Sequence, residues 1–407
     1  MQPEAFLSKK FREFYSSKKL LGPPAIAQRE FGIGAFGRKI TERHIAFDSA
    51  ADLNHFLRDE SPLFVSYSAA YYSFPERKPM SAKGFLGSDL VYEFDADDLR
   101  TECKQEHDKW LCRKCGAHGK GLVDECSNCG ESVEREEWVC PECLGAVKKQ
   151  VFRLLDFLRD DFGFSEGISL NFSGSKGYHI HIRSKGIRNL SDRARIELLD
   201  YLTAQQLSME ALGFNLEGKR LYCPPMASAK GWGKKVLERI VLLFEKGDAE
   251  EIAAKSGISF RRAQQLLTDR STILSELNQG LLFQIQGRDA KRFWISLVNS
   301  AVGALSLPVD RQTSSDLSKI VRVPETLHGG TGLAAKELSL KQLKEFNALN
   351  ECVVFSKKML KVELVRETPK FFLGGEWFGP LGIGEQGLPE FAAVYLAGRG
   401  ALSAVEL

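Results

Sequence analysis

Residues 88–98 read SDLVYEFDADD, a run that decides the fold because it describes a strand that is apolar up to its end and then becomes acidic. Apolar and polar positions alternate, so every second residue shares one face: Val91, Glu93, Asp95 and Asp97. Two carboxylates roughly 6.5 to 7 Å apart on a strand face repel each other unless a cation lies between them. Oxygen ligands of this kind suit hard divalent ions, so Asp95 and Asp97 predict a site for Mg²⁺ or Mn²⁺. Taken alone, a D-x-D pair is more often a solvated turn.

Residues 168–183, ISLNFSGSKGYHIHIR, predict two strands joined by a glycine-rich turn. Small residues between Ser173 and Gly177 let backbone N–H groups approach an anion, and Lys176 adds a positive charge. His179 and His181 fall on one face of the second strand. The turn suits a triphosphate, although a Gly/Ser turn is usually an ordinary hairpin and paired histidines also occur as a metal site.

A later segment adds a third acid and two more cationic or imidazole groups. Asp310 follows the apolar run Leu307-Pro308-Val309, and Arg322 and His328 follow within KIVRVPETLHGGTG. Each is weak evidence alone, because Asp310 could cap a helix and Arg322 could be a surface charge. Together, three acids, several phosphate-directed cations and histidines on glycine-rich turns fit two-metal nucleotidyl transfer.

The composition is that of a globular chain, with 407 residues, 43% hydrophobic and 27% charged. Its net charge of +3 does not by itself indicate a nucleic-acid partner. The apolar runs are shorter than the roughly 18 residues of a membrane helix, and MQPEAFLSKKFREFYSSKK has no apolar signal region. We therefore expect no membrane association, and a cytoplasmic location, or a nuclear one if the chain is eukaryotic.

Seven of the nine cysteines lie between Cys103 and Cys143, which favours metal ligation over disulfides. Two C-x-x-C pairs separated by ten residues have the spacing of a zinc ribbon, and a third pair with an upstream Cys and His makes a Cys₃His set that encloses it. We expect two structural zincs, with His118 as a rival ligand and one zinc plus free thiols as the alternative. The expected ligands are Cys112, Cys115, Cys126 and Cys129 for the ribbon, and Cys103, His107, Cys140 and Cys143 for the outer set.

The pattern predicts an α+β (mixed α/β) fold whose core of mixed sheets is flanked by helices. The expected core is discontinuous, comprising residues 1–100, 145–190 and 291–407. Residues 101–144 are expected to form a zinc-binding knob with the ribbon inserted in it. Residues 191–290 have helical periodicity and are expected to form an all-helical subdomain.

In order along the chain, the motifs resemble those of the small catalytic subunit of archaeal and eukaryotic DNA primases. The resemblance covers nearly the whole chain. It includes Arg29-Glu30-Phe31-Gly32 with Arg43, AYYSFPE leading into LVYEFDADD, the outer cysteine set, a helix closing with DFGF, the SGxxGxH turn and the late LHxxTG segment. The inner ribbon looks like an addition to this pattern.

By this resemblance Asp95, Asp97 and Asp310 would be the catalytic, metal-binding acids. Six residues would grip the triphosphate of the incoming nucleotide: Arg43, Ser173, Lys176, His179, Arg322 and His328. The implied activity is synthesis of short primers de novo on single-stranded DNA from nucleoside triphosphates, with an iron–sulfur large subunit as partner. Two departures are Ser175, where family members often have a second basic residue, and Glu93, an extra acid of open role.

Two other functions fit part of the sequence. A related primase-polymerase of DNA repair or gap filling would use the same catalytic inventory. A DNA-binding regulator would explain the ribbon and the helix-turn-helix flavour of EEIAAKSGISFRRAQQLL, but it leaves the three acids unexplained. For a template strand, the segment with Lys230, Trp232, Lys234 and Lys235 is a candidate for backbone and stacking contacts.

Overall fold

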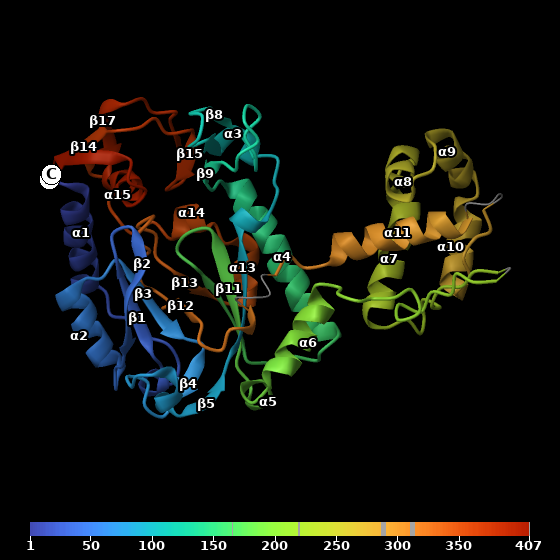
Figure 1. Cartoon of the computed structure of the whole chain (residues 1–407), viewed down its shortest axis with the longest axis horizontal. Helices are drawn as coiled ribbons and strands as arrows, with labels where there is room; N and C mark the ends of the chain where they lie inside the picture. Colours follow the sequence, from blue (N-terminus) through green and yellow to red (C-terminus); the bar gives the residue numbers. More distant parts are fainter. Residues whose placement is uncertain (165, 219, 286–289, 310–313, 407) are drawn as a thin grey trace. The chain divides into compact units, whose positions relative to one another are not determined.

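The computed structural model describes residues 1–164, 166–218, 220–285, 290–309 and 314–406. These form two compact units (Figure 1). Unit 1 comprises Met1–Phe152, Glu166–Arg195 and Pro308–Leu407, and unit 2 comprises Arg153–Ser165 and Ile196–Leu307. Within the described residues, no helix combines the length and the apolar character needed to cross a membrane.

Unit 1 contains a four-stranded sheet, the first sheet, with strand order β12-β3-β1-β2 and antiparallel pairing throughout. Its strands are β1 (Phe31–Ala35), β2 (Arg38–Ile45), β3 (Phe64–Ser68) and β12 (Ile320–Arg322). Helices α1 (Pro3–Ser17) and α2 (Ala50–Glu60) lie together beside it (Figure 1). β12 comes from far along the chain and pairs with β3, which is buried along its whole length. This pairing brings residues 320–322 into the same sheet as the N-terminal strands.

A second four-stranded sheet of unit 1 has the order β13-β10-β11-β6 and is also antiparallel. Its strands are β6 (Leu90–Asp95), β10 (Ile168–Phe172), β11 (Gly177–Ile182) and β13 (Lys336–Leu338). The predicted pair of strands in 168–183 is confirmed. The strand expected to run through Asp97 is wrong at its end, because β6 stops at Asp95 and Ala96–Asp98 form a 3-10 turn.

The cysteine-rich segment of unit 1 holds a small sheet of order β8-β7-β9, followed by the long helix α4. These elements are α3 (Lys104–His107), β7 (Lys109–Leu111), β8 (His118–Lys120), β9 (Glu134–Glu136) and α4 (Pro141–Asp160). Just before β6 in the chain, β4 (Ala70–Tyr72) pairs with β5 (Phe85–Ser88). The short helix α5 (Lys185–Arg188) follows β11.

The C-terminal part of unit 1 returns to short strands around the buried helix α15 (Glu390–Gly398). Its sheet has the order β17-β14-β18, beside the hairpin β15-β16. The remaining elements are α13 (Leu340–Glu345), α14 (Ala348–Glu351), β14 (Met359–Leu364), β15 (Phe371–Leu373), β16 (Glu376–Phe378), β17 (Gly384–Pro389) and β18 (Leu402–Glu406).

Unit 2 is built from helices, which include α7 (Gly231–Lys246), α8 (Ala249–Ser256), α9 (Phe260–Thr268), α10 (Arg270–Gln279) and α11 (Ala290–Leu305). α6 (Asp192–Leu202) begins in unit 1. The proposed stacking role of Trp232 is wrong, because this side chain is only 3% exposed. Its ring packs 5.2 Å from that of Phe157, and its indole N–H donates to the Tyr201 carbonyl at 2.8 Å. The chain as a whole is α+β, as expected.

Candidate active site

The acidic end of β6 lies against the glycine-rich turn between β10 and β11. In the antiparallel register, Asp95 lies opposite Gly177 and Glu93 lies opposite His179. A Cβ at position 177 would collide with the Asp95 carboxylate and the Phe94 carbonyl, so only glycine permits this approach. The turn residues are therefore brought next to the first carboxylate by strand pairing.

The turn itself is closed by Ser173. Its Oγ accepts hydrogen bonds from the backbone N–H groups of Ser175 and Gly177, both at 3.3 Å. Gly174 has a φ of +79°, and its carbonyl accepts from Thr331 Oγ1 at 2.6 Å. Two of the N–H groups expected to face an anion are thus used within the turn, and the turn is anchored to the segment that carries His328.

Asp97 lies in the turn after β6 and forms an ion pair with Lys176. The ammonium of Lys176 also lies 3.6 Å from a carboxylate oxygen of Glu137. Burial lowers the pKa of Lys176, and the nearby Asp95 carboxylate opposes that shift. The other carboxylate oxygen of Asp97, Oδ1, is buried and has no hydrogen-bond partner among the residues that the structure describes.

Glu93, the extra acid of the motif, connects the two sheets. One of its oxygens lies 3.4 Å from His179 Nε2, and the other lies 2.9 Å from the Lys319 ammonium beside β12. Burial raises the pKa of Glu93, but the charges of His179 and Lys319 outweigh this, and the net shift is downward. Burial lowers the pKa of His179, although Glu93 and Asp95 oppose it. Glu93 is thus an ionised partner of two cationic or imidazole groups.

Three more predicted residues come from the first sheet and the segment after it: Arg43 on β2, Arg322 at the end of β12, and His328 beyond it. The Arg43 guanidinium donates to Glu30 Oε1 at 2.9 Å and to the Ser318 carbonyl at 3.0 Å. Burial lowers the pKa of Arg322 to about 10, and this side chain donates to the Val65 carbonyl at 3.2 Å. Burial also keeps the pKa of His328 well below its usual value, with nearby Arg322 acting in the same direction. Its ring meets that of Phe64 edge to face at 5.1 Å.

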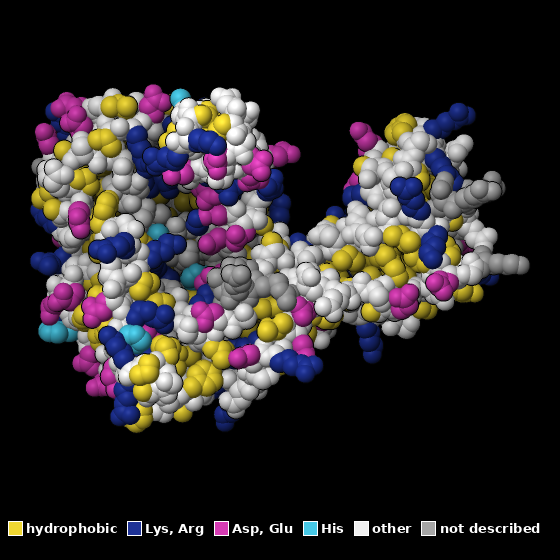
Figure 2. All heavy atoms as spheres, in the orientation of Figure 1, with side chains coloured by type: hydrophobic (Ala, Val, Ile, Leu, Met, Phe, Trp, Pro, Cys, Tyr) yellow, Lys and Arg dark blue, Asp and Glu magenta, His cyan; other side chains and the backbone are white. Residues whose placement is uncertain are grey.

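These groups surround one cleft of unit 1 with a volume of about 560 Å³. Figure 2 shows Lys, Arg, Asp, Glu and His side chains around a hollow on this unit. Seven predicted residues line it, namely Arg43, Asp95, Ser173, Lys176, His179, Arg322 and His328. Asp97 reaches it through its ion pair with Lys176, and Asp310 lies outside the described residues.

The cleft also contains charged residues that the sequence did not single out: Lys39, Glu137, Asp316, Lys319 and Arg399. Lys319 forms an ion pair with Glu93 of the second sheet, and Glu137 lies near Lys176. The sequence offered one indication of this position: Lys319 lies three residues before Arg322, directly before the strand that carries that predicted residue. Without the pairing of β12 to β3, nothing in the sequence directs Lys319 toward Glu93.

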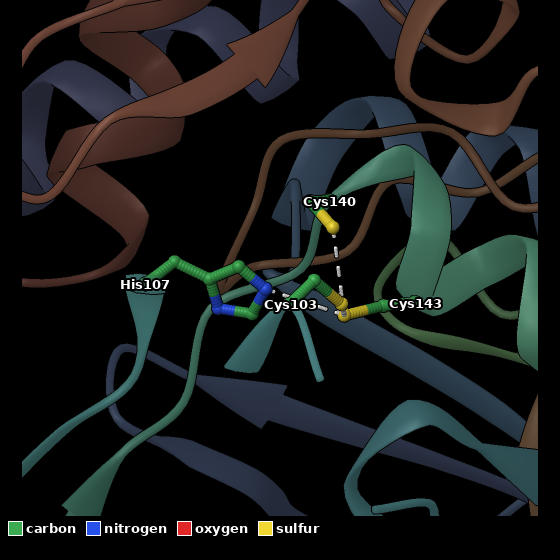
Figure 3. A group of neighbouring side chains, drawn as sticks. All are labelled: Cys103, His107, Cys140 and Cys143. Carbon is green, nitrogen blue, oxygen red and sulfur yellow. Dashed lines mark hydrogen bonds between the residues drawn. The ribbon is translucent and has the colours of Figure 1, made fainter. Parts of the chain in front are cut away.

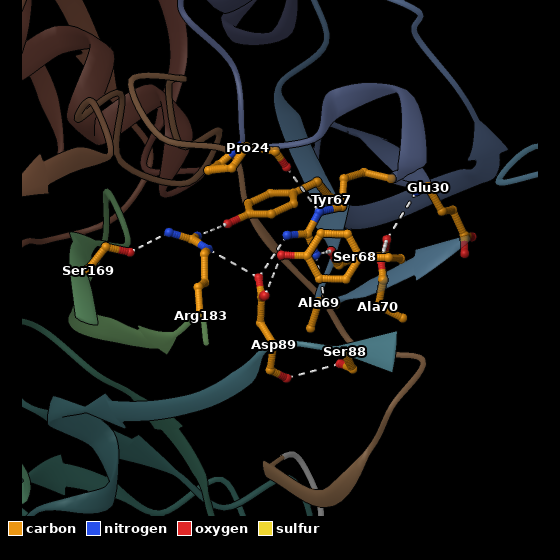
Figure 4. Close-up of polar contacts among 12 residues, drawn as sticks. Pro24, Glu30, Tyr67, Ser68, Ala69, Ala70, Ser88, Asp89, Ser169 and Arg183 are labelled. Carbon is orange, nitrogen blue, oxygen red and sulfur yellow. Dashed lines mark hydrogen bonds and ion pairs between the residues drawn. The ribbon is translucent and has the colours of Figure 1, made fainter. Parts of the chain in front are cut away.

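A buried ionic network joins the two large sheets (Figure 4). Asp89, next to β6, accepts from Arg29 at 2.8 Å, from Arg183 at 3.1 Å and from the Tyr71 hydroxyl at 2.7 Å. Arg183 also donates to the Tyr67 hydroxyl at 2.9 Å. Because Arg29 and Asp89 are at most 2% exposed, each requires the other as a partner, so this network fixes how the two walls of the cleft face each other.

The outer cysteine set converges on one point (Figure 3). Cys143 Sγ lies 3.4 Å from Cys103 Sγ, 3.7 Å from Cys140 Sγ and 3.4 Å from His107 Nε2. Tetrahedral zinc with thiolate bonds of about 2.3 Å places sulfurs about 3.8 Å apart, so the set fits zinc. Asp108 Oδ1 lies 2.8 Å from His107 Nδ1, and such a carboxylate orients a ligating imidazole.

The inner ribbon forms a second four-residue group: Cys112, Cys115, Cys126 and Cys129. Its sulfurs approach to 3.5 Å between Cys112 and Cys129 and 3.6 Å between Cys115 and Cys126. His118, the rival ligand, is exposed and lies outside both groups, with Nδ1 3.3 Å from the Gly116 carbonyl. Both groups could bind a metal ion and are compatible with zinc.

Comparison with known proteins identifies the class to which this fold and cleft belong. The family described as DNA primase small subunit matches residues 129–340. The DNA primase small subunit PriS of Methanothrix thermoacetophila is 32% identical, over 97% of this chain and 97% of its own length. Those of Methanococcoides burtonii and Methanocella arvoryzae are each 28% identical, over 98% of both chains.

The chain therefore belongs to the DNA primase small subunit family. Membership implies, in general terms, a nucleotidyltransferase that is directed by DNA. The matched residues include the turn with Lys176, His179 and the segment with Arg322 and His328.

Proposed function

We propose that this chain is the catalytic subunit of a DNA primase that synthesises short primers de novo on single-stranded DNA during replication. In this proposal it joins nucleoside triphosphates by two-metal nucleotidyl transfer and releases pyrophosphate. One observation carries it: the carboxylate of Asp95 and the cationic groups of Lys176 and Arg322 line the same cleft of unit 1. Developing negative charge on a transferring phosphoryl group needs this combination.

Asp95, Asp97 and Asp310 are the proposed metal-binding acids. The buried Oδ1 of Asp97 lacks a partner among the described residues, which fits an atom whose ligand is a cation. When bound, two Mg²⁺ or Mn²⁺ ions would supply activation of a 3′-hydroxyl and neutralisation of the triphosphate. The ion pair with Lys176 holds the Asp97 carboxylate beside the glycine-rich turn.

The nucleotide's triphosphate is proposed to bind between the two sheets. Ser173, Lys176 and His179 would contact it from the β10–β11 turn and β11. Arg43 and Arg322 would contact it from the first sheet, and His328 from the segment after β12. Burial makes the charge of Arg322 effective, because this side chain is under 10% exposed and the local dielectric is low, whereas the buried, neutral imidazole of His328 would contribute a hydrogen bond. No protein nucleophile is needed for this chemistry.

Two structural zincs, one in each cysteine group, complete the proposed cofactor set, since all four positions of each site are filled by protein. We further propose a catalytic core of residues 1–100, 145–190 and 291–407, with the knob at 101–144 and the helical subdomain at 191–290. The proposed partner is an iron–sulfur primase large subunit, and the proposed compartment is the cytoplasm of an archaeal cell, like those of the relatives named above.

Incubation with single-stranded DNA and nucleoside triphosphates, without a primer, tests the proposal. Short products should form with Mg²⁺ or Mn²⁺, and an Asp95→Asn variant should lose roughly 100-fold or more of the rate. Asp98→Asn, a neighbouring acid outside the cleft lining, is the matched control and should retain the rate. Extension of a supplied primer without any primer-independent product would favour the repair polymerase instead. Full activity of Asp95→Asn would contradict the assigned site.

A further inference from the structure

The segment 248–268 of unit 2 forms a helix, a tight turn and a second helix (Figure 1). α8 ends at Ser256 and α9 begins at Phe260, so three residues connect them. Gly257 has a φ of +75°, in the left-handed region, and its N–H donates to the Ala253 carbonyl at 2.9 Å. A three- or four-residue turn with such a glycine is typical of the helix-turn-helix motif.

The buried positions of the two helices also follow this motif. Ile252 is fully buried on α8, and Ala263 and Leu266 are buried on α9. The Ser259 hydroxyl accepts a hydrogen bond from the Arg262 N–H at 3.4 Å and begins α9 with a cap. α8 packs on α7 and α11 as well as on α9, which holds the pair inside the helical unit. One face of α9 therefore packs in the core of unit 2, and the opposite face is exposed.

The exposed side of α9 is polar and carries positive charge, and its Arg261 and Gln265 border a hollow of about 560 Å³ that Asp269 and Gln284 also line. The exposed side chains of α9 are Phe260, Arg261, Gln264, Gln265 and Thr268. α9 has two arginines and no acidic residue. Among the described residues, the side chains of Arg261, Gln264 and Gln265 take part in no ion pair or side-chain hydrogen bond. In Figure 2, Lys and Arg side chains stand over the helical unit on the face in view.

We infer that α9 is a recognition helix that binds double-stranded DNA in the major groove. Arg261 and Gln265 are four residues apart and lie on one side of the helix, so both can reach base edges together. Arginine pairs with guanine and glutamine with adenine through two hydrogen bonds each, and Phe260 suits a thymine methyl group. In a helix-turn-helix, residues from the N-terminal part of the second helix make these contacts.

The chemistry favours duplex DNA over other nucleic acids. The groove of B-form DNA, about 12 Å wide, admits an α-helix, whereas the major groove of A-form helices is too narrow for side chains to read. Single-stranded binding depends on stacking against several aromatic rings, and the outward face of α9 offers Phe260 alone. The first turn of α8 carries the acidic Glu250 and Glu251, which DNA phosphates would repel. The positive charge that would face the phosphates therefore comes from α9. This binding activity is additional to the cleft and does not depend on the proposed catalysis.

Binding of the full-length chain to a fluorescent duplex of about 20 base pairs, roughly two helical turns, tests the inference. The double variant Arg261→Ala, Gln265→Ala should weaken duplex binding by about tenfold or more. Its affinity for a single strand of the same length, and its primer synthesis, should stay unchanged, because both side chains are exposed and outside the cleft. Arg159→Ala, which removes an exposed arginine from α4, is the control and should leave duplex affinity unchanged.

Unchanged duplex affinity of the double variant would overturn the inference. So would an equal loss of affinity for duplex and single strand, because that result describes a general electrostatic contact. If the variant bound duplex normally but lost a protein partner in co-purification, the face would be a protein-docking surface and the inference would be wrong. Failure of primer synthesis by the unmodified chain bears on the cleft alone.

Discussion

The two cysteine groups differ in their ligands, three cysteines and a histidine in the outer group against four cysteines in the inner one, and they differ in what surrounds them. The outer group lies beside Trp138, whose ring packs 5.5 Å from that of Phe371 and 6.1 Å from that of Tyr395. The guanidinium of Arg399 lies 3.9 Å over the same Trp138 ring, and Tyr395 and Arg399 both line the cleft. The outer group is thus continuous with the packing that supports the proposed site.

The inner group is surrounded by exposed ion pairs instead. Lys114 lies 2.9 Å from Glu131, and Arg113 lies 2.7 Å from Glu134, all with side chains at least half exposed. Solvent screens exposed pairs of this kind, so they contribute little to the stability of the ribbon. A metal in the inner group would therefore organise the ribbon locally, whereas a metal in the outer group would hold part of the core. Three substitutions test this difference.

The largest effect is expected for Cys143→Ser, which removes the sulfur nearest to the other three outer ligands. We expect the zinc content to fall from two to one per chain and the free energy of unfolding to fall by more than about 5 kcal/mol, because structural zinc sites contribute folding energy directly. Mass spectrometry of the intact chain and urea unfolding measure both quantities. Cys352→Ser, at a buried thiol outside both groups, should keep two zincs. Two zincs in Cys143→Ser would disprove the ligand assignment.

Trp138→Ala should lower the free energy of unfolding by about 3 to 5 kcal/mol, because it leaves a cavity where a 1% exposed indole packs. Both zincs should remain, since Trp138 is not a ligand. Primer synthesis should fall, because Tyr395 and Arg399 lose their support at the cleft. Trp377→Ala removes an indole that is 51% exposed and should cost under about 1 kcal/mol. If the two variants lost the same amount of unfolding free energy and of primer synthesis, Trp138 would not be what connects the outer cysteine group to the cleft.

The smallest effect is expected for Cys126→Ser in the inner group. It should also lower the zinc content to one per chain. The free energy of unfolding of the rest of the structure should change by no more than about 1 kcal/mol. Primer synthesis should be retained, because the residues of the cleft and Trp138 are untouched. Parallel assays of Cys126→Ser and Cys143→Ser provide the comparison. A loss in Cys126→Ser as large as that in Cys143→Ser would mean that the two groups form one structural element.

The parts of the structure that the sequence predicted well depend on residues close together in the chain. The hairpin of β10 and β11 needs only the alternating runs and the glycines between Phe172 and Tyr178, which pair directly. The ribbon needs only its two C-x-x-C pairs. The end of β6 was wrong by two residues, because the backbone turns after Asp95 and the alternation of side chains stops there.

Other features could not be predicted because they depend on which segments pack together. Trp232 looked available for stacking because lysines flank it, yet α7 turns its ring into the core of unit 2. Arg29 and Asp89 are 60 residues apart and meet only where the two large sheets face each other. Asp310 lies outside the described residues, so its place in the acidic site stays a prediction.

The sequence by itself determined the local devices: the acidic end of β6, the tight turn before Gly177, the cysteine spacings and the cap that starts α9. Each depends on a few neighbouring residues whose backbone geometry is set by sterics and short-range hydrogen bonds. Only the tertiary structure decided that Glu93 meets Lys319 and that the charges of two sheets share one cleft. Such pairings depend on the packing of distant strands, and burial then sets the pKa of each group they bring together.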